Sequence, residues 1–180
     1  MLSEPLQLNK IEATHLFDFL YSFFHRDFVA NRTYLNQTIY IDPRSNRLDD
    51  GKEADFWHLT TRKQEKIIKQ GNRYIKTIER YPDFRRAERI EWVKQILDNY
   101  NHETVKWFYY QETNQKRDIR LYLWAYQDDF VVILQKLGRS SSFLVTSFYI
   151  DNEDKKRDYE QRFNSYKNKE NRSLLGCEWF

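Results

Sequence analysis

The chain has 180 residues and a mass of 22.3 kDa, a size typical of one domain with its own hydrophobic core. Aromatic residues make up 17% of the chain, which excludes a disordered chain. Charged residues make up 32%, which predicts a heavily charged surface. The net charge of +3 is too small for the whole chain to bind a polyanion by charge alone. The single cysteine, Cys177, excludes an intrachain disulfide and a cysteine-based metal cluster.

The N-terminal third predicts helical and short extended elements. Residues 8–28 have the spacing of an amphipathic helix that covers a sheet, and neither they nor any other stretch form a signal peptide or a membrane span. We therefore expect a soluble, cytoplasmic protein. Residues 38–41 predict a short strand that ends at Asp42-Pro43, and residues 56–60 predict another.

Residues 62–89 predict a basic helical segment. They contain ten basic and four acidic residues, so their net charge of +6 exceeds that of the whole protein. The cations alternate with Tyr74, Tyr81 and Phe84, a composition typical of a surface that binds a phosphate backbone. A solvated basic helix without a ligand explains the same composition.

Residues 84–100 predict a helix with Asp83 as its N-cap. Its apolar stripe, extended one turn towards the N-terminus, reaches Arg86, which should therefore lean towards the sheet. A cation in that position needs an anion. The anion is either a carboxylate, such as Asp118 or Asp129, or a phosphate of a substrate.

Four strands are predicted in the third quarter, separated by turns that are too short for crossover helices. They are Val105 to Glu112, Asp118 to Tyr126, Asp129 to Lys136 and Ser142 to Ile150. The fold expected is α+β, with N-terminal helices packed on a four-stranded antiparallel meander and a C-terminal helix from residue 152 to 169. We expect one domain over 1–180: a helical cap (1–37), a core (38–151) with a basic insertion (62–81), and a C-terminal helix and tail (152–180).

The second predicted strand has two distinct faces. Ile119, Leu121 and Leu123 point one way and are expected in the core. The residues that point the other way, Arg120 and Tyr122 among them, predict a surface that contacts a ligand or partner.

Several chemistries have no motif here: there is no glycine-rich phosphate loop, no pair of Cys or His at metal-ligand spacing and no Gly-x-Ser-x-Gly elbow. No cofactor and no metal are expected. His58, beside the basic segment, is the best candidate for a general acid or base, although a lone histidine often has only a structural role. Cleavage of RNA through its own 2'-hydroxyl needs only a base, cations at the phosphate and aromatic rings for the bases.

Five stretches resemble a phage- and mobile-element-associated bacterial family that we place with the barnase, EndoU, colicin and RelE (BECR-fold) superfamily of endoribonucleases. They are Phe56-Trp57-His58-Leu59-Thr60-Thr61-Arg62, Asp83 to Trp92, Arg120 to Trp124, Phe130 to Leu134 and Leu144 to Tyr149. The resemblance spans 38–167. This chain departs from the family pattern in its long basic insertion between His58 and the helix of Arg86.

The resemblance implies RNA bound across an open side of the sheet and a set of site residues. The implied catalytic residues are His58, Arg86, Arg120 and Thr146, and the implied substrate contacts are Trp57, Arg62, Arg89, Tyr122 and Tyr149. Strict alternation places Thr146 and Tyr149 on opposite faces of their strand, and a bulge near Ser147 would bring them together.

The function expected is that of a metal-independent endoribonuclease of the RelE/barnase-like type, which leaves 2',3'-cyclic phosphate ends. Members of the superfamily often act as growth-inhibiting toxins, so an antitoxin or immunity protein is an implied partner besides RNA. The alternative is a non-catalytic RNA-binding or protein-interaction module on the same fold. Binding of DNA by the basic insertion is a third interpretation, with no helix-turn-helix motif to support it.

Overall fold

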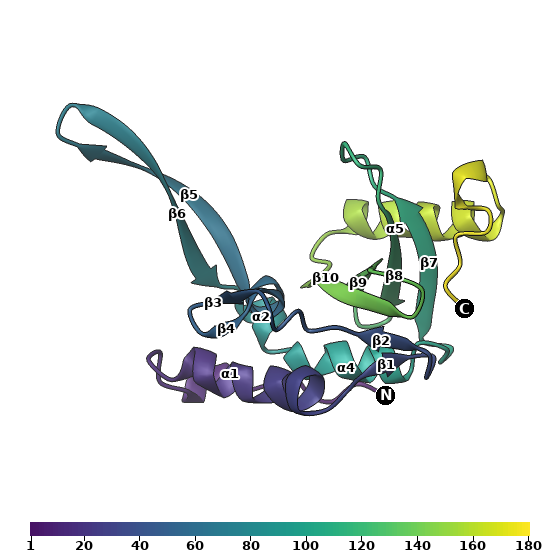
Figure 1. Ribbon diagram of the computed structural model, residues 1–180, viewed down its shortest axis with the longest axis horizontal. Helices are drawn as coiled ribbons and strands as arrows, with labels where there is room; N and C mark the ends of the chain where they lie inside the picture. Colours follow the sequence, from purple (N-terminus) through teal and green to yellow (C-terminus); the bar gives the residue numbers. More distant parts are fainter.

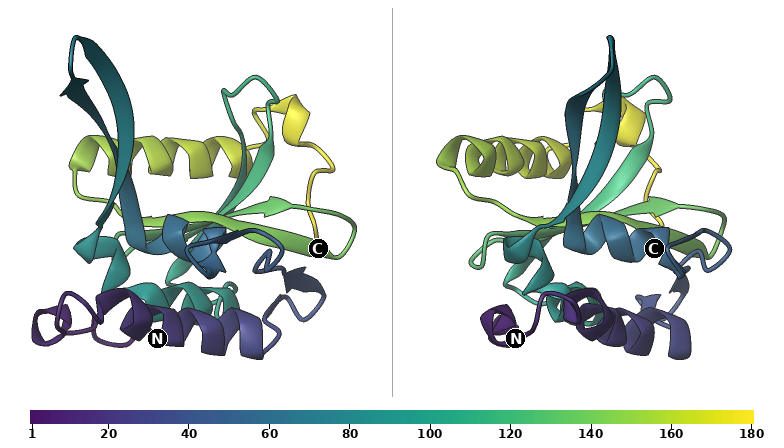
Figure 2. Two further views of the ribbon diagram at one scale, coloured as in Figure 1. Left: turned by 60° about the vertical axis from the view of Figure 1, so that its left-hand side comes forward. Right: turned by 90° about the vertical axis from the view of Figure 1, so that its left-hand side faces the viewer.

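The computed structural model describes the whole chain, Met1 to Phe180, as an α+β arrangement of three layers (Figure 1). Helices α1 (Leu16–Phe24) and α4 (Ile90–Asp98) form one layer, a sheet forms the middle, and α5 (Glu153–Lys167) covers the opposite face. Strands β5 (Thr61–Gln70) and β6 (Arg73–Pro82) form a separate hairpin, here called the arm, which projects away from these layers (Figure 2). None of the helices combines the length and the apolar character that a membrane span requires.

The central sheet has six strands in the order β1-β2-β10-β9-β8-β7. They are β1 (Tyr34–Leu35), β2 (Ile39–Ile41), β7 (Val105–Gln111), β8 (Ile119–Ala125), β9 (Phe130–Lys136) and β10 (Ser141–Tyr149). Strands β7 to β10 are antiparallel neighbours, but β2 pairs with β10 in parallel, Tyr40 opposite Ser141 and Ile41 opposite Ser142. The predicted four-stranded antiparallel meander is therefore wrong: the sheet is mixed, because a segment from far earlier in the chain extends it.

Both faces of the sheet are covered. The larger core, of 27 buried residues, lies between the sheet and the helices α1, α2 (Ala54–Thr60) and α4. A second core of seven buried residues, which include Tyr122, Trp124 and Tyr159 of α5, lies between the sheet and α5. The prediction that this second face is a contact surface is wrong, and so is the implied open side of the sheet, because α5 occupies it.

The remaining elements are short. They are the 3-10 turn η1 (Leu8–Lys10), the π-helical turn η2 (His25–Ala30), strands β3 (Leu48–Asp49) and β4 (Lys52–Glu53), helix α3 (Phe84–Ala87) and the 3-10 turn η3 (Arg172–Leu174). The helix predicted over 8–28 begins only at Leu16, and the helix predicted over 84–100 is divided into α3 and α4. Asp83 is the N-cap of α3, as predicted, and its side chain accepts a hydrogen bond from the Arg86 amide.

Residues 56–60, predicted as a strand, belong to helix α2. Phe56 and Leu59, three positions apart, are both fully buried against the layer of α1, which a helix allows and an alternating strand does not. The hydroxyls of Thr60 and Thr61 donate to the carbonyls of Phe56 and Trp57, so the last turn of the helix is stabilised by its own side chains.

The basic segment, predicted as helical, forms the arm. Gly71, at φ +63°, and Asn72 form a two-residue turn, and glycine is favoured there because its positive φ causes no steric clash. The register is regular from Thr61 opposite Pro82 to Gln70 opposite Arg73. Only the base of the arm touches the body, where Thr61 follows α2 directly and Pro82 leads into α3.

Candidate active site at the foot of the arm

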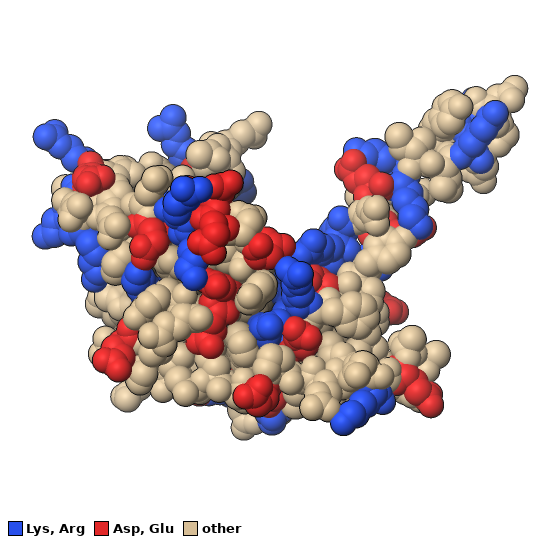
Figure 3. Space-filling view, turned by 180° about the vertical axis from the view of Figure 1, so that it is seen from behind, with Lys and Arg blue, Asp and Glu red and all other residues tan.

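A cleft of about 450 Å³ lies where the arm leaves the body of the protein. Four elements line it: α2, the base of the arm, α3 and β10. Its lining residues are Trp57, His58, Thr61, Arg62, Lys63, Arg80, Arg86, Val145 and Thr146. Seen from behind, Lys and Arg side chains gather in the notch between the arm and the body and continue up the arm (Figure 3). The cleft therefore presents positive charge to anything that enters it.

His58 is the one exposed residue in a helix whose other side chains are buried or half-buried. The imidazole of His58 makes no hydrogen bond or ion pair. The backbone carbonyl of His58 accepts hydrogen bonds from Arg86 and Thr146. The pKa of His58 lies below its ordinary value, first because the ring is partly removed from water and second because nearby cations oppose protonation. These cations are Arg44, Lys63, Arg80 and Arg86. The ring is thus neutral near pH 7 and free to accept a proton.

Arg86 connects three elements at the back of the cleft. One terminal nitrogen, Nη1, donates to the carbonyl of His58 at 2.8 Å and lies 3.4 Å from the Thr61 carbonyl and from Thr146 Oγ1. Its Nε lies 3.6 Å from Asp83 Oδ2, whereas Nη2 makes no hydrogen bond. Arg86 thus leans against β10, as predicted, and keeps one nitrogen for a ligand.

The carboxylate paired with Arg86 is Asp83, and not Asp118 or Asp129, which the sequence suggested. Asp118 accepts a hydrogen bond from Asn114, and Asp129 is paired with Lys156. Nη1 of Arg86 is directed at backbone carbonyls, which are dipoles rather than charges, and the 3.6 Å contact of Nε with Asp83 is its one ion pair.

The other cations of the cleft come from the arm. Arg62 is paired with Asp83 at 2.5 Å, and Arg80 is paired with Asp49 at 2.6 Å. Lys63 makes no ion pair. Two carboxylates therefore oppose four cations, and the excess positive charge suits a phosphate.

Trp57 lines the cleft but cannot stack on a base. Its side chain is 4% exposed, its Nε1 donates to the carbonyl of Asp49, and the guanidinium of Arg80 lies 4.6 Å from its ring centroid. The structure therefore gives Trp57 the role of a platform for Arg80.

Arg120 and Tyr122 lie outside the cleft, on the sheet face covered by α5. Arg120 donates to Gln135 and is paired with Glu112 at 3.5 Å. Tyr122 is 3% exposed, stacks on Phe108 and donates its hydroxyl to Glu112, and burial is the first cause that raises its pKa. Neither residue can contact a substrate in the cleft, so the structure does not assemble His58, Arg86 and Arg120 around one phosphate.

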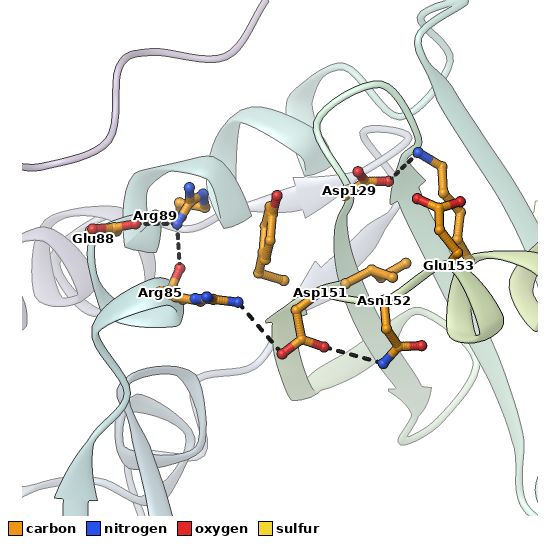
Figure 4. A pocket seen from close by; sticks show the side chains of 10 residues that line it. Arg85, Glu88, Arg89, Asp129, Asp151, Asn152 and Glu153 are labelled. Carbon is orange, nitrogen blue, oxygen red and sulfur yellow. Dashed lines mark hydrogen bonds and ion pairs between the residues drawn. The ribbon is translucent and has the colours of Figure 1, made fainter.

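Arg89 and Tyr149 line a different pocket, of about 470 Å³, between α3 and the beginning of α5 (Figure 4). Arg89 is paired with Glu88, and its guanidinium lies 4.8 Å from the ring centroid of Tyr149. The pocket's cations, Arg85, Arg89 and Lys156, face four carboxylates, Glu88, Asp129, Asp151 and Glu153. Because its charge is already balanced, this pocket offers no excess positive charge to RNA.

The bulge of β10 lies before Thr146, between Leu144 and Thr146, and not near Ser147. Thr146 pairs with Ile133 and Tyr149 with Phe130, so the two side chains remain on opposite faces. The bulge turns Val145 and Thr146 towards the cleft together, and it leaves Tyr149 in the other pocket.

The sequence interpretation missed Lys63 and Arg80 as cleft residues. They lie directly opposite each other in the arm, a pairing that follows from the turn at Gly71-Asn72. A glycine-asparagine pair between two runs rich in isoleucine and tyrosine is a hairpin signal, and reading it would have placed both residues on one face.

The chain matches no family model, no curated protein and no solved structure. Its resemblance to the endoribonuclease superfamily thus stays a prediction. No three His, Cys, Asp or Glu side chains are grouped so that they could hold a metal ion.

Proposed function

We propose that the protein is a metal-independent endoribonuclease whose active site is the cleft at the foot of the arm. The observation that carries this proposal is the unpartnered, neutral imidazole of His58 in a cleft with four cationic side chains. A base beside cations is the minimum set for cleavage of RNA by its own 2'-hydroxyl.

In the proposed reaction, His58 takes the proton of the 2'-hydroxyl, and the 2'-oxygen forms a bond to phosphorus. The free Nη2 of Arg86 and the guanidinium of Arg62 stabilise the charge on the phosphorane. The bond from phosphorus to the 5'-oxygen breaks, and that oxygen takes a proton from the ammonium of Lys63. The products are a 2',3'-cyclic phosphate and a 5'-hydroxyl.

The test is incubation of RNA with purified protein in excess EDTA, followed by analysis of the fragment ends. We expect cleavage with 2',3'-cyclic phosphate ends, and a loss of about 10²- to 10⁴-fold in rate for His58→Ala. His15→Ala is the matched control, because His15 is 71% exposed and does not line the cleft. Equal rates for His58→Ala and wild type would refute the assignment of His58.

A second candidate is a non-catalytic RNA-binding module, and the contacts of Arg86 within the protein favour it. Nη1 of Arg86 is bound to backbone carbonyls and a hydroxyl, as in a residue whose main task is to hold elements together. RNA that is bound in EDTA and remains intact would support this module and exclude the nuclease.

A further inference from the structure

The arm is a long two-stranded ribbon that has no tertiary cover beyond its base. Its faces carry exposed apolar side chains, with Tyr74 74% exposed and Ile67 73% exposed. An isolated two-stranded hairpin is only marginally stable in water and gains most from a contact partner. Such exposed side chains on a projecting element indicate a binding surface.

The charge of the arm indicates which kind of partner. Residues 61–82 contain seven basic and two acidic residues, a net charge of +5, so the rest of the chain, at −2, is acidic. Three of the arm's cations, Lys63, Lys69 and Arg73, make no ion pair. The positive charge of the arm favours a polyanion over a protein surface as its partner.

The register of the arm connects its tip to the cleft. Lys63 lies opposite Arg80 at the base, and Lys69 lies opposite Tyr74 near the tip. Because alternate residues of a strand share a face, these two pairs lie on the same side of the ribbon. Lys69 follows Lys63 by six positions, which is about 20 Å of strand. That length corresponds to about six stacked nucleotides.

We infer that this face of the arm is a second contact site for single-stranded RNA, with the strand running from the cleft to a base stacked on Tyr74. Lys69, on the same face, would contact a phosphate of the strand. The ring of Tyr74 is open to a base, and unpaired bases are the ones that can stack on an exposed aromatic side chain. The inference rests on the proposed function for its substrate class, and it specifies that substrate as an unpaired strand longer than about six nucleotides.

The test measures binding of a fluorescent 12-nucleotide and a 4-nucleotide oligouridine, in a His58→Ala background so that the RNA stays intact. Tyr74→Ala is one variant, and Lys69→Gln is the other. The matched control is Lys116→Gln, which removes the same charge from an exposed loop between β7 and β8. Circular dichroism verifies that each variant is folded.

Tyr74→Ala should weaken binding of the 12-mer about tenfold and Lys69→Gln several-fold, while binding of the 4-mer changes less than about twofold for both. Lys69→Gln should also reduce the salt dependence of 12-mer binding by about 0.7 in the slope of log K against log salt. The control should change neither value. Tip variants that bind both oligomers like the control would overturn the inference and leave the exposed isoleucines as a protein-contact surface.

The outcome for the arm is independent of the outcome for catalysis. A wild-type protein that binds the 12-mer through its tip but does not cleave RNA would refute the nuclease and keep the inference. A wild-type protein that cleaves RNA, with tip variants that bind the 12-mer as tightly as the wild type, would keep the nuclease and refute the inference. A protein that binds no RNA would refute both.

Discussion

The cluster beneath α5 and the cleft at the foot of the arm are built from the same kinds of residue, arginines beside large aromatic rings. Beneath α5, Arg120 is bound to Gln135 and Glu112, and Tyr122 is 3% exposed. In the cleft, the imidazole of His58 has no partner and Arg86 keeps a free Nη2. The comparison teaches that burial and saturation of polar groups, rather than residue type, separate a packing cluster from a binding site.

The largest effect is expected from Tyr122→Ala, which should lower the free energy of unfolding by about 3–5 kcal/mol. The variant removes a ring that packs between Phe108 and Tyr159, and it leaves Glu112 without its hydrogen bond. Chemical denaturation measures this loss. Tyr74→Ala is the exposed control and should change stability by less than about 0.5 kcal/mol. A stable Tyr122→Ala protein with weak RNA binding would break the comparison.

A smaller effect should distinguish Arg62, in the cleft, from Arg120, beneath α5. Arg62→Gln should weaken RNA binding several-fold and lower its salt slope by about 0.7, because one phosphate contact is lost. Arg120→Gln should leave the salt slope unchanged and cost about 1 kcal/mol or less of stability, because its partly exposed ion pair with Glu112 is lost. Titration of RNA at several salt concentrations measures both. A reduced slope for Arg120→Gln would place Arg120 in the RNA site.

The smallest effect is expected from pH. Because the pKa of His58 is lowered, its imidazole is already neutral at pH 7, and the cleavage rate should change less than about twofold from pH 7 to 8. The rate should fall only below the ordinary histidine pKa of about 6.5, as the ring gains its proton. Initial rates in buffers from pH 5 to 8 measure this decrease in the cleavage rate. A rate that falls as the pH rises through neutrality would assign His58 as the acid instead.

The site was partly predictable. Five of the nine residues expected in it line the cleft: Trp57, His58, Arg62, Arg86 and Thr146. The other four, Arg89, Arg120, Tyr122 and Tyr149, were taken from motifs whose order along the chain says nothing about which sheet face a helix covers. Lys63 and Arg80 are absent from the predicted site because composition favours a helix for the segment that holds them, whereas the structure makes it a hairpin.

The sequence by itself determined the elements whose signals are local. Alternation and turn residues located β7 to β10, and the N-cap at Asp83 located the beginning of α3, because period and capping depend only on near neighbours. The tertiary structure decided the rest. Residues 56–60 became a helix, β2 joined β10 in parallel, and α5 covered the face of Tyr122, since each depends on burial against distant parts of the chain.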